Sequence, residues 1–206
     1  MKKKRPAAHK AAGPKRKPIM RHSREGVKLR SKRRAGKGAP RTAPAGLKQQ
    51  YLDMFSREFP TTLKLMRAYP AGQDAFKPHE RSHSAAQLVH TFTQENGVVI
   101  AAIRGELTMP PNFPPPPATL AEAVAAYERG AKSLIDAVQA MPESRLFEKV
   151  TFFTGPGQMG QVPLIDIMWL MLMDSVHHRG QFSVYVRMAG GRVPSIYGPS
   201  ADEPWM

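Results

Sequence analysis

The sequence predicts an all-α fold, an antiparallel four-helix bundle with a long crossover between its second and third helices. Four segments place apolar residues at helical spacing, and no region is rich in strand patterns. A proline-rich run, "MPPNFPPPPAT", separates the second helical segment from the third. We expect the bundle to occupy residues 47–206 and to be preceded in the sequence by a disordered basic tail at residues 1–46.

The tail is distinguished by its charge. Residues 1–46 hold seventeen Lys and Arg and one acid, for a net charge of +16, whereas residues 47–206 hold fourteen Lys and Arg and fifteen acids, for −1. The tail has no aromatic and few apolar residues, so it cannot offset the entropy lost on ordering. It could contact nucleic acid or another polyanion, or be a non-specific extension. The lack of aromatic residues for base stacking favours the extension.

The first helix is predicted at Leu47–Tyr69, where apolar residues recur every three or four positions. Pro60 lies inside this segment and cannot donate a helical hydrogen bond. We therefore expect one helix that bends near Phe59.

Two capping boxes mark the starts of the second and third helices. The motif "SAAQ" at residues 84–87 opens a helix that should reach about Arg104, and "TLAE" at residues 119–122 opens one that should end near Ala140. The prolines between them exclude both helix and central strand. This stretch could be an SH3-type ligand, but a stiff structural crossover is the favoured interpretation.

The fourth helix is predicted from Pro163 to about Ala189. Before it come a short extended piece at residues 150–153 and the turn "GPGQMG", which lacks the Lys-Ser/Thr of a phosphate-binding loop. Gly180 lies inside the helix at a cost of about 1 kcal/mol relative to Ala, which suggests that another helix approaches closely there. The irregular segment after the helix could fold over one end of the bundle.

Composition excludes several classes of protein. The chain has no cysteine, so disulfides, thiolate metal sites and cysteine nucleophiles are absent. No secretory signal follows the basic start, and no apolar run is long enough to cross a membrane. A cytoplasmic protein without membrane contact is expected.

The segment "MLMDSVHHRGQF" at residues 171–182 concentrates ionisable groups in an apolar helix. Asp174 and His178 are four residues apart and share one helix face, whereas His177 points about 100° away. Such a pair can present two metal ligands into a bundle. The alternative is an acid–histidine contact on a solvated face. The apolar neighbours favour the metal site, because a buried carboxylate needs a partner or a metal.

A third ligand would have to come from another helix. His90 lies between Leu88 and Phe92 on the predicted second helix, although a lone histidine on an apolar helix is usually a satisfied core residue.

The stretch "MDSVHHRGQFSVYVRMAGGRVPSIYGPSADEPW" resembles the last helix and C-terminal segment of the DinB-like superfamily, the damage-inducible, YfiT-type proteins. "REFPTTLKLMRAYP" and "FKPHERSHSAAQLVHTFTQE" resemble its first two helices, so the similarity covers about residues 50–206. This family is unrelated to the DNA polymerase of the same name.

The resemblance implies a divalent metal held by one residue of the second helix and a pair on the fourth. These places fall on His90, Asp174 and His178, with Asp174 standing where the family usually has histidine. Two histidines and one carboxylate suit zinc first, with nickel, iron or manganese as alternatives.

The resemblance also assigns supporting roles. His177, Arg179 and Gln181 belong to the motif without binding the metal, and we expect His177 and Arg179 to support the site or the helix packing, paired with Glu95 or Glu106.

The activity that the resemblance implies is that of a metal-dependent thiol transferase or hydrolase-type enzyme, acting on a small molecule or thiol. Glu95 is the candidate general base, although a solvated carboxylate is an equal alternative. The competing hypothesis is a non-catalytic metal-binding or stress-response bundle. A homodimer through a bundle face is expected in either case, and the basic tail could tether either protein to nucleic acid.

Overall fold

A computed structural model describes residues 46–206, so the prediction of a disordered tail at residues 1–46 lies, but for Gly46, outside the described residues. The described chain forms four helices, a short 3-10 helix and one hairpin. In chain order these are α1 (Leu47–Arg67), α2 (Ala85–Arg104), α3 (Leu120–Ala140), η1 (Glu143–Phe147), β1 (Lys149–Gly155), β2 (Gln158–Pro163) and α4 (Leu164–Met188). The predicted four-helix bundle is confirmed.

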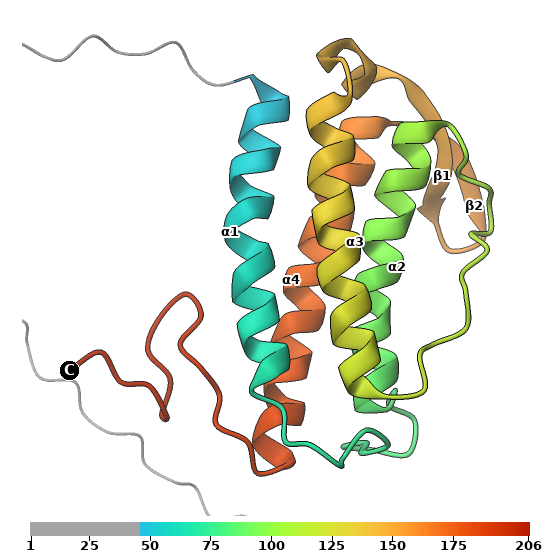
Figure 1. Cartoon of the computed structure of the whole chain (residues 1–206). Coiled ribbons are helices and arrows are strands. Elements are labelled where there is room, and N and C mark those ends of the chain that lie inside the picture. Colours follow the sequence, from blue (N-terminus) through green and yellow to red (C-terminus); the bar gives the residue numbers. More distant parts are fainter. Residues whose placement is uncertain (1–45) are drawn as a thin grey trace, which may run out of the picture. The chain divides into compact units, whose positions relative to one another are not determined.

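The helices pack so that each has two neighbours. Helix α2 packs against α3 and α4, and α1 packs against the same two helices, which places α1 diagonally across from α2 (Figure 1). The crossover after α2 returns along the bundle before α3 begins, so α2 and α3 run in the same direction (Figure 1). The α2–α4 pair is antiparallel, and this pair forms the candidate site.

The two predicted capping boxes are present. At α2, Ser84 Oγ accepts from the Gln87 amide at 3.2 Å while Gln87 Oε1 accepts from the Ser84 amide at 2.9 Å. The Thr119–Glu122 pair repeats this arrangement at α3. Each box satisfies amide groups that the first helical turn leaves free, which explains why these boundaries could be read from the sequence.

Helix α1 continues through Pro60 without ending. The proline ring is exposed, so the carbonyl that loses its helical donor faces water. The prediction of a single helix is confirmed.

The sequence prediction missed one strand. The extended piece predicted at residues 150–153 is part of a longer strand, β1, and the glycine-rich turn connects β1 to β2. In this hairpin Val150 lies opposite Val162, and Phe152 lies opposite Gly160. Two glutamines, one glycine and one proline stand among the six residues of β2, so its pattern did not indicate a strand. Phe152 and the half-buried valines of the hairpin pack against Val98 of α2 and Ile167 of α4.

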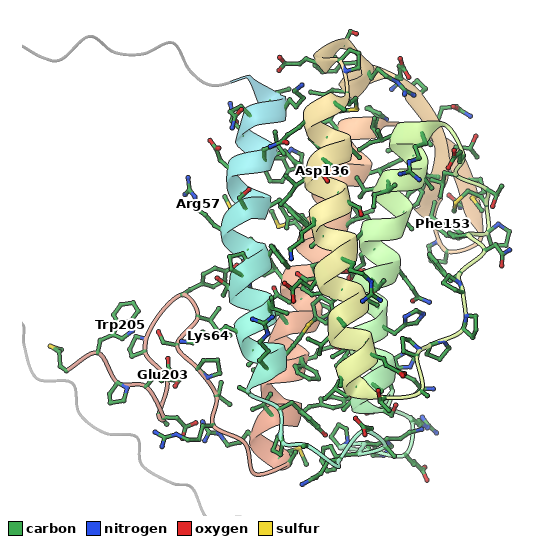
Figure 2. All side chains as sticks on the ribbon, viewed as in Figure 1. Arg57, Lys64, Asp136, Phe153, Glu203 and Trp205 are labelled. Carbon is green, nitrogen blue, oxygen red and sulfur yellow. The ribbon has the colours of Figure 1, made fainter. Side chains whose placement is uncertain are left out.

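The core contains two large buried clusters along the bundle and a third, small one that joins Phe152 of the hairpin to Val98 and Ile167. Figure 2 shows the side chains of the described residues on the ribbon. Gly180 does not mark a close helix contact, because a Cβ placed there would have no neighbour within 4 Å. Gly130 of α3 faces α2 instead, with Asn96 Nδ2 3.8 Å from its ideal Cβ position. The expectation about Gly180 was therefore wrong.

Within residues 46–206, none of the helices is both long and apolar enough to cross a membrane. The segment after α4 turns back at Gly190, which has a φ of +83°, and continues along α1. Its Glu203 lies 2.7 Å from Lys64 of α1, in the region labelled in Figure 2. The segment packs along the side of α1, whereas the sequence analysis considered that it could fold over one end of the bundle.

Candidate metal centre

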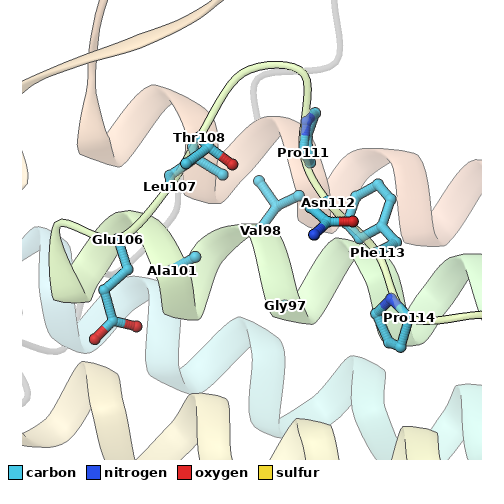
Figure 3. Close-up of a pocket in the computed structure, with 10 residues that line it drawn as sticks. All are labelled: Gly97, Val98, Ala101, Glu106, Leu107, Thr108, Pro111, Asn112, Phe113 and Pro114. Atoms are coloured by element: carbon cyan, nitrogen blue, oxygen red, sulfur yellow. The ribbon is translucent and has the colours of Figure 1, made fainter.

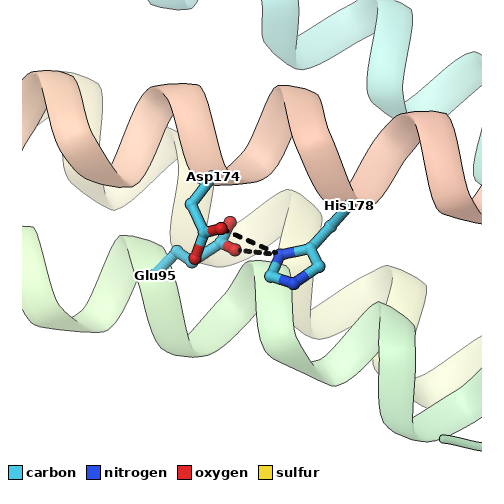
Figure 4. A group of neighbouring side chains, drawn as sticks. All are labelled: Glu95, Asp174 and His178. Atoms are coloured by element: carbon cyan, nitrogen blue, oxygen red, sulfur yellow. Dashed lines mark hydrogen bonds and ion pairs between the residues drawn. The ribbon is translucent and has the colours of Figure 1, made fainter. Parts of the chain in front are cut away.

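Three ionisable side chains meet between α2 and α4: Glu95, Asp174 and His178 (Figure 4). His178 Nδ1 lies 2.6 Å from Glu95 Oε1 and 3.9 Å from Asp174 Oδ1. One potential ligand atom from each residue can be chosen so that all three lie within 4.8 Å of one another. This is the group of described residues whose donor atoms could hold a metal ion.

The helical repeat explains the arrangement. Asp174 and His178 are one turn apart on α4 and therefore point to the same side. Glu95 reaches them from the facing helix. Its side chain is only 5% exposed, whereas that of Asp174 is 42% exposed, so the cluster has a buried side and an open side.

Hydrogen bonds hold the buried carboxylate. The Ser175 hydroxyl donates to Glu95 Oε2, and the His178 ring contacts Oε1. The Phe92 ring lies edge-on to His178 at 6.0 Å between centroids. Both oxygens of Glu95 thus have partners, and it is not the solvated carboxylate considered in the sequence analysis.

The surroundings of the cluster raise the pKa values of Glu95 and His178. Burial raises the pKa of the Glu95 carboxyl above 4.5, although hydrogen bonds from His178 and Ser175 oppose the rise. The hydrogen bond to Glu95 raises the pKa of His178 above 6.5, against the opposing effect of partial burial. The pair therefore retains a proton to higher pH than the separate groups would.

This group differs from the ligand set that the family resemblance implies, because it holds Glu95 where that set has His90. Five residues separate His90 from Glu95, so their side chains point about 140° apart around α2. His90 is buried, and its Nε2 lies 3.2 Å from the Pro114 carbonyl of the crossover. Its Nδ1 has no hydrogen-bond partner in the described part of the chain. His90 is therefore a buried histidine with only one of its two ring nitrogens paired, unlike the satisfied core residue that the sequence analysis named as the usual case.

His177 and Gln181 form a separate pair on the outside of α4. His177 is exposed, and its Nε2 lies 2.8 Å from Gln181 Nε2. Neither pairs with Glu95 or Glu106. The His177 ring does lie beside the His178 ring, with 5.4 Å between centroids.

Arg179 belongs to a different network, which the sequence analysis missed. Its side chain is 2% exposed, and its Nη1 lies 2.6 Å from Glu58 Oε2 of α1 and 3.3 Å from Thr62 Oγ1. Tyr197, from the segment after α4, accepts a hydrogen bond from Arg179 Nη2 and donates one to Glu58 at 2.7 Å. The expected pairing of Arg179 with Glu95 or Glu106 is wrong, because residue 179 points about 100° away from His178, towards α1.

The residues fit a divalent cation. Two carboxylates and an imidazole are common ligands of zinc, which they bind at about 2.0–2.2 Å, and the three donor atoms lie within 4.8 Å of one another. A buried carboxylate beside a second carboxylate is costly without a cation or a proton to compensate. Oxygen is the majority donor, whereas the sequence predicted two histidines and one carboxylate.

A separate cavity of about 170 Å³ lies between α2 and the crossover (Figure 3). Gly97 and Ala101 form its floor, and Phe113 and the crossover prolines form its rim. Glu106 is its one titratable residue, so this cavity has no set of groups for catalysis or metal binding.

One sequence signal could have identified Glu95 as a ligand. It lies seven residues, close to two full helical turns, after Leu88 on the apolar stripe of α2, at a position where a carboxylate would face the core. The fourth helix then offers Asp174 and His178 opposite it.

Comparisons with known proteins agree with this fold. A sequence model described as "DinB family" matches residues 43–205. A DinB-like protein from Bacillus cereus ATCC 10987 is similar in structure, with a TM-score of 0.61 over 72% of this chain and 97% of that one, at 17% identity. The DinB-like protein YjoA from Bacillus subtilis has a TM-score of 0.58 over 71% and 97% of the two chains, at 20% identity. At these identities the likeness shows the fold alone.

A curated relative is the uncharacterized protein YrdA of Bacillus subtilis strain 168, which is 32% identical over 94 residues. The match covers 45% of this chain, and the chain spans about half the length of that relative, 52%. The family match extends over nearly the whole described region, including both helices of the cluster. The chain belongs to the DinB family.

Proposed function

We propose that Glu95, Asp174 and His178 bind one divalent metal ion and that the protein uses it in a transferase or hydrolase reaction. The observation that carries the proposal is the convergence of these three donors from α2 and α4 on a site with one open side. A bound cation would lower the pKa of a coordinated water or thiol and so supply a nucleophile at neutral pH.

The donors also suggest which ion to test. Carboxylate oxygens suit manganese and magnesium, and imidazole suits zinc, iron and nickel. The two carboxylates move the preference from zinc towards manganese and iron, which the sequence analysis gave as alternatives, while the usual order of affinities still favours zinc over manganese at equal concentration. Zinc and manganese are therefore the two informative probes.

The chain's own residues would have distinct roles. Ser175 orients Glu95, and Phe92 covers one side of the His178 ring. Glu95 lies on the buried side of the cluster, away from the open side at Asp174, so it fits the role of ligand better than that of general base. The exposed side of Asp174 is where a substrate could approach.

The test is metal binding by calorimetry with zinc and manganese at pH 7.5. We expect one equivalent to bind the wild type, and His178→Gln and Asp174→Asn to weaken the affinity at least tenfold, as expected when a ligand is lost. The matched control is His177→Gln, which removes the neighbouring exposed histidine and should bind like the wild type. Absence of binding at 100 μM free zinc would refute the proposal.

His90→Gln separates the two ligand sets. If Glu95 completes the site, this variant retains the metal. If His90 is a ligand, the folded variant loses it, and α2 must rotate on binding. Circular dichroism shows whether each variant is folded.

The reaction is tested next. Metal-loaded protein is incubated with a small thiol and an aryl halide, and thioether formation and halide release are measured together. Transfer joins the sulfur to the aryl carbon, the halide leaves with the bonding pair, and the thiol proton passes to solvent. Turnover that His178→Gln abolishes supports a transferase. Tight metal binding without turnover of thiols or simple esters would favour the non-catalytic alternative.

A further inference from the structure

We infer that the substrate of the proposed reaction carries a carboxylate, which binds in a cavity beside the metal cluster. This cavity, the Arg81 cavity, has a volume of about 370 Å³. Residues 81–83 of the loop before α2 form one wall, and Leu88, Gln181, Val184 and Tyr185 form the rest. The inference rests on the proposed function, because it assigns the substrate class of the same site.

The Arg81 cavity lies on the same seam between α2 and α4 as the metal cluster. The buried Leu88 precedes Glu95 by seven residues on α2. The buried Tyr185 follows His178 by seven residues on α4. Seven residues turn a helix by about 700°, so each of these residues points within about 20° of its partner in the cluster. Because the two helices are antiparallel, both steps lead towards the same end of the bundle (Figure 1).

The spacing along the helices sets the length of the substrate. Gln181 and Tyr185 lie three and seven residues beyond His178, which corresponds to about 5–10 Å along α4. Phe92 and Phe182, one turn from the cluster on each helix, are fully buried beneath this stretch. A molecule that reaches from the metal to the cavity therefore spans one to two helical turns, with apolar atoms between its two ends.

The charge of the cavity selects an anion. Arg81 is its one permanent charge, and none of its lining residues is acidic. The side chain of Arg81 has no hydrogen-bond or ion-pair partner among residues 46–206. The hydroxyl of Ser82 and the side-chain amide of Gln181 add two neutral donors to the same cavity. A guanidinium without a partner, beside donors and away from acids, attracts a negatively charged group.

The anion is a carboxylate rather than a phosphate. A single planar guanidinium matches a carboxylate through two parallel hydrogen bonds. A phosphate group would draw on the free amides at the start of α2. Those amides are already used, because residues 85–87 donate to Phe76, Asp74 and Ser84. One cation and no free helix amides therefore favour a monoanion.

Hydrogen bonds hold the wall of the cavity in place without a ligand. The Tyr185 hydroxyl donates to the His83 carbonyl at 2.9 Å, which ties the loop to α4. The Ser82 amide donates to the His79 carbonyl at 2.9 Å, and the Arg81 amide donates to His79 Nδ1 at 3.2 Å. The loop backbone is thus fixed, and the binding of a carboxylate has to order little more than the Arg81 side chain.

Calorimetry of the zinc-loaded full chain tests this with mercaptohexanoate and its alcohol, mercaptohexanol. Both molecules present a thiol to the metal, but only the acid carries a carboxylate far enough away to reach the cavity. We expect the acid to bind about fivefold tighter or more, and Arg81→Gln to remove the difference. Mercaptoacetate is too short to reach Arg81 and should bind both proteins equally. Equal affinities of the wild type for the long acid and its alcohol would overturn the inference.

Arg57→Gln is the matched control. Arg57 is exposed on α1 (Figure 2), which lies diagonally across from α2, and this variant should keep the preference of the wild type for the acid. Zinc itself should bind Arg81→Gln with the affinity of the wild type. A wild type that binds no zinc refutes the metal centre, whereas zinc binding without a preference for the acid refutes the carboxylate site alone.

The metal-free protein gives a second readout. Hexanoate and inorganic phosphate are titrated separately, and nuclear magnetic resonance follows the amide signals of residues 81–83 and Gln181. We expect saturable shifts with hexanoate that Arg81→Gln abolishes and Arg57→Gln preserves. Absence of these shifts, or tighter binding of phosphate than of hexanoate, would overturn the inference whether or not the protein binds zinc.

Discussion

His178 and Arg179 are adjacent in the sequence but belong to two polar clusters with opposite properties. The cluster of Glu95, Asp174 and His178 is open on one side, and its carboxylates outnumber its cation. The Arg179 cluster is closed, because Glu58, Thr62 and Tyr197 surround a guanidinium that is 2% exposed. Open and unbalanced groups are available for chemistry, whereas closed and balanced groups hold helices and the last segment together.

The largest effect is expected when the closed cluster is broken. Arg179→Ala leaves Glu58 buried without its cation, and we expect the free energy of unfolding to fall by about 3–5 kcal/mol. Asp174→Ala, in the open cluster, should change it by less than about 1 kcal/mol, since the side chain is 42% exposed. Urea denaturation measures both. Equal losses of unfolding free energy in the two variants would mean that both clusters contribute to stability in the same way.

The next effect concerns the open cluster alone. Glu95→Gln preserves the shape of the side chain but removes its charge, so we expect zinc affinity to fall at least a hundredfold while the protein remains folded. The loss corresponds to about 2.7 kcal/mol of binding free energy. Calorimetry and a thermal melt of the same sample give the two values. Unfolding of this variant would show that Glu95 is needed mainly for structure.

A smaller effect is expected from Tyr197→Phe. Its hydroxyl accepts from Arg179 and donates to Glu58. Removing a bridging hydroxyl should lower the free energy of unfolding by about 0.5–1.5 kcal/mol, with metal affinity unchanged. Parallel denaturation and zinc titration of this variant provide the measurement. Weaker zinc binding would reveal a coupling between the clusters that their separate contacts do not predict.

The most gradual effect is a dependence on pH. Folding raises the pKa values of Glu95, from 4.5, and of His178, from 6.5, so the folded metal-free protein binds protons more tightly than the unfolded chain. Stability from this pair is complete at acidic pH and is lost as pH rises through the raised pKa values. Thermal melts from pH 5.5 to 8.5 should show a falling midpoint without metal. His178→Gln should flatten this dependence, and an equally steep fall in that variant would assign it to other groups.

Features that depend on neighbours in the sequence were predictable. The boxes at residues 84–87 and 119–122 use bonds between residues three apart, and α2 and α3 begin where these boxes predict. The pairing of Asp174 with His178 follows from the helical repeat in the same way. The strand β2 was missed because glycine and polar residues conceal its pattern.

The assignment of partners across helices was not predictable. His90 and Glu95 lie on the same helix, and either could have faced α4. The rotation of α2 about its axis points Glu95 towards α4, where it contacts His178, and points His90 towards the crossover. Arg179 found its partner on α1 because α4 packs between α1 and α2, which no spacing within the motif reveals.

The sequence by itself determined that this chain forms four helices, where two of them begin, that α4 carries an acid and a histidine on one face, and that the chain resembles the DinB family. These properties arise from contacts between residues at most four positions apart, or from the motif itself. Only the tertiary structure decided that Glu95 completes the cluster and that Arg179 pairs with Glu58. Those outcomes depend on how each helix is rotated against its neighbours, and a rotation of 100° exchanges one residue for the next.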